Sequence, residues 1–483
     1  MKCTAIIGLA VMSLTGMKAQ PTLTTLDLSA CIDKALAYSY SLKQSNNNLR
    51  ASYGDVQASM GSMLPQVNLG AGNGWNAGLV VDPVTNQIQT NTLGTASGSL
   101  GMSLNVFDGG QNLNRWRQAK VNAAVAMLQV DNAAQLVVLN TASQYLTLLV
   151  AIEAERIAMG QETLSGKQLQ RTQTMHDAGA ISLSELLQAK SQLARDIQRV
   201  VAAMAQRSLA HLSLSQTMGM NEDFSIDGTL LGINDKPTAE LAIQPTVLYA
   251  ASNGKQPSIQ MATLQVESSE LAVKVAKAGR LPRLSMSGQM STSYSDRALK
   301  QTGSTSAVGE IGYFISPQGN QIPVMTSYQI PTFTAVNLQD QFNNNRRQFV
   351  GFNLSIPVFS GFQIANSIQR AQVQHDNAAL QLMQEEDSYR QVIERAHHDA
   401  QSAWKNHEAA KAALVAAKRS LDDAQIRREE GIMNALDYAR IQDSYYAASS
   451  EAIRSKYDAI FKNYILTFYA NPPQYHAEDQ RQF

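Results

Sequence analysis

The segment SLGMSLNVFDG, from Ser99 to Gly109, changes its pattern part of the way along. Apolar and polar residues alternate as far as Val106, which is typical of a β-strand with one apolar and one polar face. The next three residues, Phe107-Asp108-Gly109, combine a residue type that caps helices with a glycine and favour the start of a helix. The segment GFNLSIPVFSG, from Gly351 to Gly361, repeats this order in the second half of the chain. Both segments therefore predict a strand that leads into a helix.

Two long stretches of the chain contain no proline, one between Pro83 and Pro237 and one between Pro357 and Pro472. Proline inside a helix removes a hydrogen bond and clashes with the previous turn, so both stretches are predicted to be mostly helical. The spacing from Gly109 to Gly179 equals that from Gly361 to Gly431, which predicts two long helices of equal length. At 1.5 Å per residue each would be about 100 Å long, more than a globular core needs.

The chain has the pattern of an internal duplication, roughly 22–220 and 240–470. Besides the matching helices, the spacing from Leu42 to Pro65 equals that from Ile259 to Pro282. The stretch from the proline of the Leu-Pro pair to the glycine before the long helix is longer in the second half, from Pro282 to Gly361, than in the first, from Pro65 to Gly109. These extra residues fall in the Ser/Thr/Asn/Gln-rich stretch from Ser295 to Arg347.

Each half also contains a second alternating run, so each half is predicted to hold one hairpin of two strands. The run includes Val67 and Leu69 in the first half, and Leu284 and Met286 in the second. Strands of about ten residues are long enough to cross a bilayer obliquely. Aromatic residues near the strand ends fit the aromatic belts of membrane strands: Trp75, Phe107, Tyr294 and Phe359. A soluble sheet with one solvated face explains the alternation equally well when the strands are considered alone.

Four strands cannot close a pore, and an open sheet edge is not tolerated in lipid. Strands that cross a membrane would therefore have to come from several chains, each contributing four. A membrane-spanning helix is not expected. The nearest candidate, Leu136 to Ile152, is interrupted by polar residues such as Asn140 and Gln144 and is predicted to be a packed soluble helix.

The first 19 residues have the pattern of a secretory signal peptide, with Lys2, an apolar run from Ala5 to Leu14 and a plausible cut after Ala19. The mature chain then retains only Cys31, so it cannot form an intramolecular disulfide. The full chain is 44% hydrophobic and has 39 basic and 39 acidic residues. This balance excludes a nucleic-acid partner and a disordered tail.

The sequence carries no recognisable catalytic, cofactor-binding or metal-binding motif, so neither an enzyme activity nor a cofactor is expected. Gly70-x-Gly72-x-Gly74 lies in a predicted strand with no helix after it, unlike a dinucleotide loop. The histidines, including His397, His398 and His407, have no companion cysteines at zinc spacing. We expect these histidines on solvated faces of helices.

Together these features resemble the TolC-like outer membrane efflux protein family. The resemblance covers essentially the whole mature chain and rests on the order, duplication and spacing of motifs rather than on any single one. The motifs are Leu28-Ser29-x-x-Ile32-x-x-Ala35-Leu36, the corners Leu64-Pro65 and Leu281-Pro282, Val106-Phe107-Asp108-Gly109, Val358-Phe359-Ser360-Gly361, Gly179-x5-Glu185-x3-Ala189 and Gly431-x5-Asp437.

The resemblance implies a mixed α/β membrane protein that forms a homotrimer. Twelve strands, four per chain, would form one β-barrel in outer-membrane lipid, continued into the periplasm by a barrel of long α-helices. The trimer would be a passive exit channel that works with a periplasmic adaptor protein and an inner-membrane pump, in efflux or in type I secretion. The cargo stays open. The alternative from another class is a periplasmic coiled-coil scaffold or adaptor without a pore.

The expected domain division is a signal peptide at 1–19, a first repeat at 20–220, an equatorial segment at 221–245, a second repeat at 246–470 and a tail at 471–483. The first repeat would contain a hairpin at about 64–107, a long helix at 109–178 and a return helix at 183–217. The second would contain a hairpin at about 281–359 with a long loop at 295–346, a long helix at 361–430 and a return helix at 434–468. Loops 76–96 and 295–346 would face outside the cell.

In the proteins that this chain resembles, polar contacts at the periplasmic end hold the channel nearly shut. Glu185 and Asp437 each come six residues after the glycine of a turn and are candidates for this gate. Ser182-x-x-Glu185 and Asn434-x-x-Asp437 also read as ordinary capping boxes, and the two roles are compatible. Arg440 stands where the family often has a further acid, and we expect it to pair with Asp437 or Glu185.

The resemblance also implies that the two turns receive the periplasmic adaptor. The turn residues are Gly179, Ala180, Ile181, Ser182, Leu183, Gly431, Ile432, Met433, Asn434 and Ala435. The apolar members of this set can equally be staples that pack across each turn. The second turn departs from the family pattern, because Arg428 stands in place of an aromatic residue and Met433 in place of a basic one.

Overall fold

The computed structural model describes residues 24–82, 86–90, 92–226, 239–473 and 475. The predicted signal peptide lies outside the described residues, as do parts of the expected equatorial segment and of the tail. The described chain divides into two compact units, and each unit draws on both halves of the sequence. We call them the helical unit (described residues of 1–50, 124–263 and 380–483) and the strand unit (described residues of 51–123 and 264–379).

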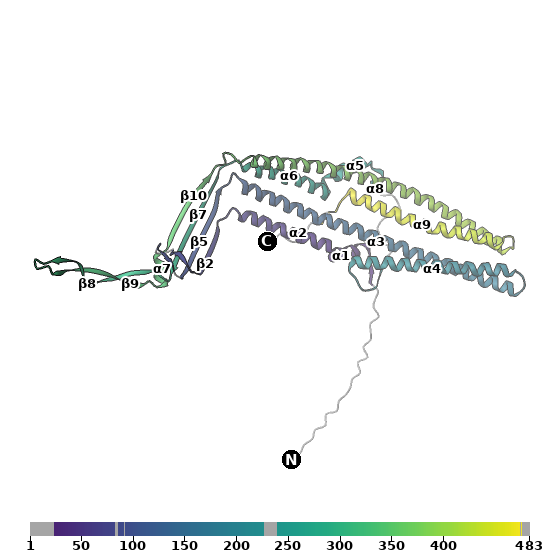
Figure 1. The fold of residues 1–483 in the computed structure, drawn as a ribbon. Helices are drawn as coiled ribbons and strands as arrows, with labels where there is room; N and C mark the ends of the chain where they lie inside the picture. The colour runs from purple at the N-terminus through teal and green to yellow at the C-terminus, as the bar shows by residue number, and fades with distance from the viewer. Residues whose placement is uncertain (1–23, 83–85, 91, 227–238, 474, 476–483) are drawn as a thin grey trace, which may run out of the picture. The chain divides into compact units, whose positions relative to one another are not determined.

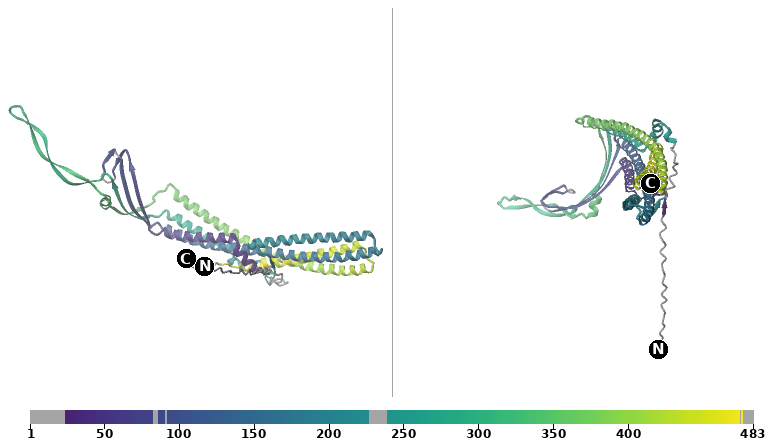
Figure 2. Two further views of the ribbon diagram at one scale, coloured as in Figure 1. Left: turned by 90° about the horizontal axis from the view of Figure 1, so that it is seen from below. Right: turned by 90° about the vertical axis from the view of Figure 1, so that its right-hand side faces the viewer.

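The strand unit contains a four-stranded antiparallel sheet in the order β10–β7–β5–β2 (Figures 1 and 2). Its strands are β2 (Gln66–Asn76), β5 (Leu93–Phe107), β7 (Arg283–Ser295) and β10 (Arg347–Ser355). The hairpins of the two halves join through β5 and β7, where Leu100 lies opposite Met290. β2 and β10 are therefore the edge strands. Large apolar side chains on both edge strands are exposed, with Leu69 at 83% and Phe352 at 68%.

The stretch between β7 and β10 forms a second hairpin that the sequence analysis did not predict. β8 (Leu299–Ile315) pairs with β9 (Gln321–Ala335), and α7 (Leu338–Asn344) follows. Buried hydrogen bonds hold the base of this hairpin: Gln341 Nε2 donates to the Ser295 carbonyl at 2.9 Å, and Ser295 Oγ donates to Asp82 Oδ2 at 2.6 Å. In the first half, β3 (Leu79–Val81) and β4 (Ile88–Thr90) form a much shorter pair.

The main helices of the two halves have the same lengths. α2 (Tyr40–Gly61) and α6 (Pro257–Ala278) have 22 residues each. α3 (Gln111–Asp177) and α8 (Gln363–Glu429) have 67 residues each, and α4 (Leu183–Met218) and α9 (Ala435–Ala470) have 36 each.

The capping residues in the sequence explain where α3 and α8 begin. Asp108 Oδ2 accepts a hydrogen bond from the Asn112 backbone N–H at 2.9 Å, and Ser360 Oγ accepts one from the Ile364 N–H at 3.4 Å. Gly109 has a φ of +70°, a left-handed conformation that favours glycine.

One core of the helical unit lies where α1 (Leu28–Tyr38) packs on α3 and α4. Asp27 caps α1, since its Oδ1 accepts from the Ala30 N–H at 2.8 Å. The core side chains include Cys31, Tyr145, Leu148 and Leu214. Next to this core, β1 (Thr24–Leu26) pairs in parallel with β6 (Phe224–Ile226).

α3 includes an 18-residue window with a mean hydropathy of 1.4, which by length and composition is apolar enough to cross a membrane. Uninterrupted apolar runs in the sequence predict no such helix, because polar residues break the nearest run, Leu136 to Ile152. Half of the window is buried inside the molecule. The apolar face of α3 contributes Tyr145 and Leu148 to the core with α1 and α4, so packing accounts for the buried half of this composition.

A second core forms where α5 (Pro245–Ser252) covers α8 and α9, with the short helices η1 (Ala239–Ala242) and η2 (Asn253–Lys255) on either side of α5. Its side chains include Leu248, Ile393 and Leu466. His397 on α8 is buried, and its Nε2 lies 3.1 Å from the Leu241 carbonyl oxygen. The expectation of a solvated His397 is therefore wrong, because the chain before α5 covers that face of α8.

Candidate functional site

The turns that join α3 to α4 and α8 to α9 have the same backbone geometry. Gly179 has a φ of +74° and Gly431 a φ of +77°. The Ala180 N–H donates to the Met175 carbonyl at 2.8 Å, and the Ile432 N–H donates to the Arg427 carbonyl at 2.9 Å. These bonds close the left-handed turn that commonly ends a helix at a glycine. The glycine spacing in the sequence therefore has a direct backbone cause at both turns.

The return helices α4 and α9 begin with matching side-chain caps. Ser182 Oγ accepts from the Glu185 N–H at 3.3 Å, and Asn434 Oδ1 accepts from the Asp437 N–H at 2.8 Å. The Asp437 carboxylate makes two further contacts. Its Oδ2 accepts from Asn434 Nδ2 at 2.7 Å, and its Oδ1 lies 3.7 Å from Arg440 Nη1. Capping thus uses the residue before each helix, while the Asp437 carboxylate contacts other side chains.

The charge of Glu185 affects Arg428, which stands where the family pattern has an aromatic residue. Arg428 on α8 is half-buried, and its guanidinium lies over the Tyr438 ring at 5.2 Å from the centroid. Desolvation lowers the pKa of Arg428, and the negative charge of Glu185 partly offsets this effect. The Asp437 carboxylate therefore pairs with Arg440 on the same helix, whereas Glu185 acts on Arg428 through the electrostatic effect of its charge.

The apolar residues of the turns differ in their environments. Ile432 is 72% exposed and Leu183 is 57% exposed. Met433 instead packs against the small core of Leu421, Ala424 and Tyr438, and Ile181 is half-buried. Met433 therefore acts as a staple across its turn, whereas Ile432 and Leu183 present apolar surface to solvent.

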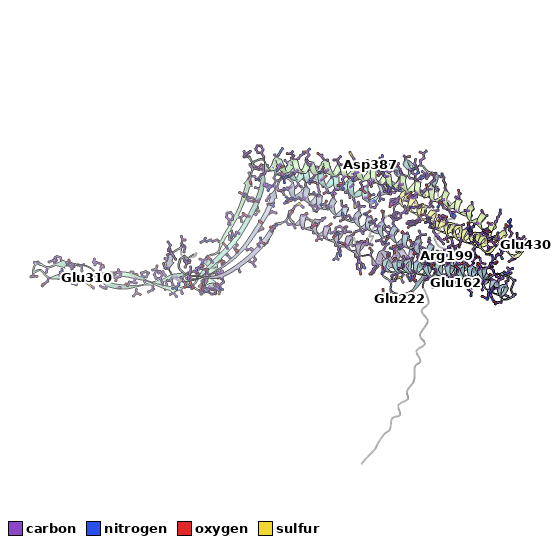
Figure 3. All side chains as sticks on the ribbon, turned by 45° about the vertical axis from the view of Figure 1, so that its right-hand side comes forward. Glu162, Arg199, Glu222, Glu310, Asp387 and Glu430 are labelled. Atoms are coloured by element: carbon purple, nitrogen blue, oxygen red, sulfur yellow. The ribbon has the colours of Figure 1, made fainter. Side chains whose placement is uncertain are left out.

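An ionic network around the buried Asp196, further along α4, was not found from the sequence. Asp196 is fully buried, accepts a hydrogen bond from Ser165 Oγ of α3, and lies 2.8 Å from Arg199 Nη1. Arg199, labelled in Figure 3, also donates to Asp443 Oδ1 of α9 at 2.9 Å. Burial lowers the pKa of Arg199, but the hydrogen bonds and charges of Asp443 and Asp196 outweigh it and raise the pKa.

The network links three helices, because Asp196 of α4 accepts from Ser165 of α3 and Arg199 of α4 donates to Asp443 of α9. The Asp196-x-x-Arg199 spacing on one helix face was visible in the sequence, but the partner on α9 was not. A buried charge persists only where it is paired and hydrogen-bonded, and the Asp196 carboxylate is both.

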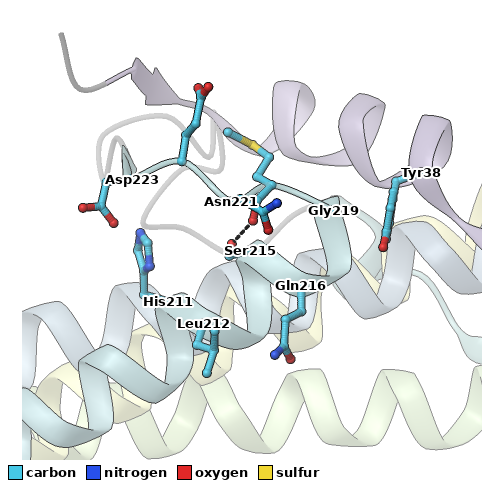
Figure 4. Close-up of a pocket in the computed structure, with 10 residues that line it drawn as sticks. Tyr38, His211, Leu212, Ser215, Gln216, Gly219, Asn221 and Asp223 are labelled. Atoms are coloured by element: carbon cyan, nitrogen blue, oxygen red, sulfur yellow. Dashed lines mark hydrogen bonds between the residues drawn. The ribbon is translucent and has the colours of Figure 1, made fainter. Parts of the chain in front are cut away.

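A cavity of about 590 Å³ lies where α4 ends (Figure 4). Gly219 ends α4 with a φ of +66°, and a Cβ there would lie 2.2 Å from the Tyr38 ring. His211 stacks on Phe224, and its Nε2 lies 3.1 Å from the Phe224 carbonyl oxygen. Ser215 Oγ donates to the Met220 carbonyl. These polar contacts hold the chain as it leaves the helix.

Comparison with known proteins gives one consistent result. A family model described as outer membrane efflux protein matches residues 31–220 and 248–462. The outer membrane protein TolC of Escherichia coli (strain K12) is 22% identical over 425 residues, which cover 86% of this chain and 76% of that protein.

Two solved structures have the same fold. CusC superposes with a TM-score of 0.72 at 14% sequence identity, covering 93% of this chain and 92% of the other. The outer membrane protein VceC of Vibrio cholerae superposes with a TM-score of 0.70 at 15% identity, covering 92% of this chain and 95% of the other.

Proposed function

The chain belongs to the outer membrane efflux protein family, and from this premise we propose that it is the passive outer-membrane exit channel of a tripartite efflux or type I secretion system. Its outer membrane localisation follows from its relatives. The observation that carries the proposal is the combination of a four-stranded sheet with exposed apolar side chains and two 67-residue helices in one chain.

In the proposed assembly, three copies close one barrel of twelve strands. Each chain ends its sheet at β2 and β10, and an open edge of this kind is not tolerated in lipid. Pairing β2 of one copy with β10 of the next removes every open edge. Exposed Leu69 and Phe352 on these strands would then face lipid or a neighbouring copy.

The chain is further proposed to be an internal duplication. The equal lengths of α2 and α6, α3 and α8, and α4 and α9 support it, as do two separate matches to one family model. The repeats would be 20–220 and 246–470, after a signal peptide at 1–19. The segments 221–245 and 471–483 would form an equatorial belt around helices that extend into the periplasm, and the β8–β9 hairpin would face outside the cell.

The turns at Gly179 and Gly431 are proposed to lie at the periplasmic end. Exposed Leu183 and Ile432 offer apolar surface for an adaptor hairpin, and an inner-membrane pump would supply the energy. Glu185 and Asp437 would form the gate.

Arg440 lies 3.7 Å from Asp437. This distance supports a gate in which Arg440 pairs with Asp437, and in which position 440 does not add a further negative charge to a ring of acids.

Reconstitution of the detergent-purified chain in a planar bilayer tests the function. A channel gives discrete single-channel conductance steps from detergent-extracted protein. A periplasmic scaffold without a pore would instead be extracted without detergent and would conduct no ions.

A further inference from the structure

The two faces of the four-stranded sheet differ in polarity. Along β7, Ser285 and Ser287 lie on one face and Leu284 lies on the other, because successive side chains of a strand point to opposite faces. Cross-strand partners share a face, and Ser287 lies between Ser103 of β5 and Gly351 of β10. We call the face that carries Ser287 the polar face, and the opposite one the apolar face.

The only charged side chains on the polar face, among the described residues, are two arginines. Arg283 is the first residue of β7 and Arg347 is the first residue of β10, and these two strands are antiparallel. Arg283 lies opposite Ser355, and Arg347 lies opposite Ser291. The two arginines are therefore about 26 Å apart along the strands. This separation is similar to the height of the apolar band of a membrane barrel, roughly 25 Å.

No negative charge accompanies these arginines on the sheet. β2, β5, β7 and β10 contain no aspartate, glutamate or lysine, and no third arginine. Both arginines are exposed, and neither forms an ion pair with any residue that the structure describes. Arg283 also lines a cavity of about 480 Å³, whose other polar side chains are neutral: Gln111, Ser355, Ser360, Gln363 and Ser367. The polar face therefore carries positive charge that no acid on the sheet compensates.

We propose that Arg283 and Arg347 make the strand part of the channel favour negatively charged cargo over positively charged cargo. This inference rests on the proposed function, in which the apolar face of the sheet contacts lipid and the polar face lines a water-filled lumen. Three copies would place three arginines at each end of that lumen. A pore lined by arginine attracts anions and repels cations, because little counter-charge screens the guanidinium groups there.

The acids at the helical turns require a test that is specific to the strands. Glu185 and Asp437 belong to the helical unit, and as gate residues they would favour cations at another part of the path. The ion selectivity of the whole channel combines both parts. The experiment therefore measures the electrostatic potential at the polar face itself.

A cysteine in place of Ser287 reports this potential. Ser287 lies midway between the levels of the two arginines, about 13 Å along the strands from each. The full chain with Cys31→Ser and Ser287→Cys is reconstituted in liposomes and treated with an anionic or a cationic methanethiosulfonate reagent. The ratio of the two reaction rates cancels differences in access to the cysteine. At about 10 mM salt, where the Debye length is about 30 Å, the ratio should favour the anionic reagent.

Two double variants and one control identify the charges responsible. Arg283→Gln with Arg347→Gln should lower the ratio of anionic to cationic rate at least about threefold, as Coulomb's law gives for two charges at this distance in water. Arg283→Lys with Arg347→Lys keeps both charges and should keep the ratio. Arg346→Gln is the matched control, since Arg346 lines a cavity with Leu69 and Leu100 of the apolar face. It removes a charge next to Arg347 in the chain and should leave the ratio unchanged.

The same ratio with and without the two arginines would overturn the inference. A fall in Arg346→Gln as large as that in the double glutamine variant would also overturn it. Failure of the proposed function is a separate result. A chain that gives no conductance steps contradicts the channel, whereas a conducting channel with an unchanged ratio contradicts only the role of the two arginines.

Discussion

At the scale of residues, the two helical turns combine backbone requirements with charged side chains. Ser182 and Asn434 cap the return helices, which leaves the carboxylates of Glu185 and Asp437 available for other partners. Asp437 pairs with Arg440 at 3.7 Å on the same helix, and the negative charge of Glu185 favours the charged form of Arg428. In the proposed gate these charges stabilise the closed arrangement, so removing one of them would favour opening.

The gate assignment predicts the effect of single substitutions. Glu185→Ala, Asp437→Ala and Arg440→Ala should each raise the closed-state leak in planar bilayers severalfold, because each removes one charge of a proposed closing pair. Asp55→Ala, which changes an exposed acid on α2, is the control and should leave the leak unchanged. An unchanged leak in all three turn variants would remove the gate assignment.

The network around Asp196 predicts a large effect on stability. Asp196→Ala leaves Ser165 and Arg199 without a buried acceptor and should lower the free energy of unfolding by about 2–4 kcal/mol. Glu451→Ala breaks an exposed pair with Arg454 and should cost less than about 1 kcal/mol. Guanidinium unfolding in detergent measures both, and equal costs would show that the network contributes little.

At the scale of elements, the glycines that end strands and helices determine where each element begins and stops. Gly109 lies between β5 and α3 with a φ of +70°, and a Cβ there would lie 2.8 Å from Leu281 Cβ. Gly160 lies inside α3 with no atom within 4 Å of the position of its Cβ. The first glycine is required by the structure, and the second is not.

This difference predicts that alanine has opposite effects on the Tm at the two positions. Gly109→Ala should lower the Tm, because it combines left-handed strain of about 1–2 kcal/mol with a steric clash. Gly160→Ala should raise the Tm, because alanine favours a helix interior over glycine by about 1 kcal/mol. Thermal unfolding followed by circular dichroism measures both. A stabilising Gly109→Ala would contradict the assigned geometry.

The sequence predicted the elements whose signals are local. The alternating run to Val106 and the cap at Asp108 indicated β5 and α3 to within a few residues of Leu93–Phe107 and Gln111–Asp177. The β8–β9 hairpin was missed, because Pro323 and Pro331 interrupt the pattern of β9 and proline is atypical of strand interiors. The Arg199–Asp443 contact joins residues far apart in the chain, and no local pattern encodes it.

At the scale of the whole molecule, a single chain leaves both edges of its four-stranded sheet open. Many of its large apolar side chains are exposed as well. An open sheet edge is not tolerated in lipid, and the proposed assembly of several copies would close it. The family assignment and the outer membrane localisation expected from the sequence are confirmed. The trimer remains a proposal.

Docking of the adaptor predicts a loss of binding without a loss of conductance. Ala180→Trp and Ala435→Trp place bulky side chains on the two turns and should abolish co-purification of the periplasmic adaptor. Ala58→Trp, on an exposed position of α2, is the control and should leave co-purification intact. Undiminished adaptor binding by both turn variants would exclude these turns as the docking site.

Cross-linking of the edge strands tests the central claim most directly. In a Cys31→Ser background, cysteines are introduced in pairs along β2 and β10, beginning with Leu69→Cys and Phe352→Cys and varying the register. Leu100→Cys with Met290→Cys, which face each other on β5 and β7 of one chain, is the control and should link within a single chain. The account predicts that at least one β2–β10 pair gives a covalent trimer under oxidising conditions. If every edge pair leaves only monomers while the control pair links, the closed barrel of three chains is contradicted.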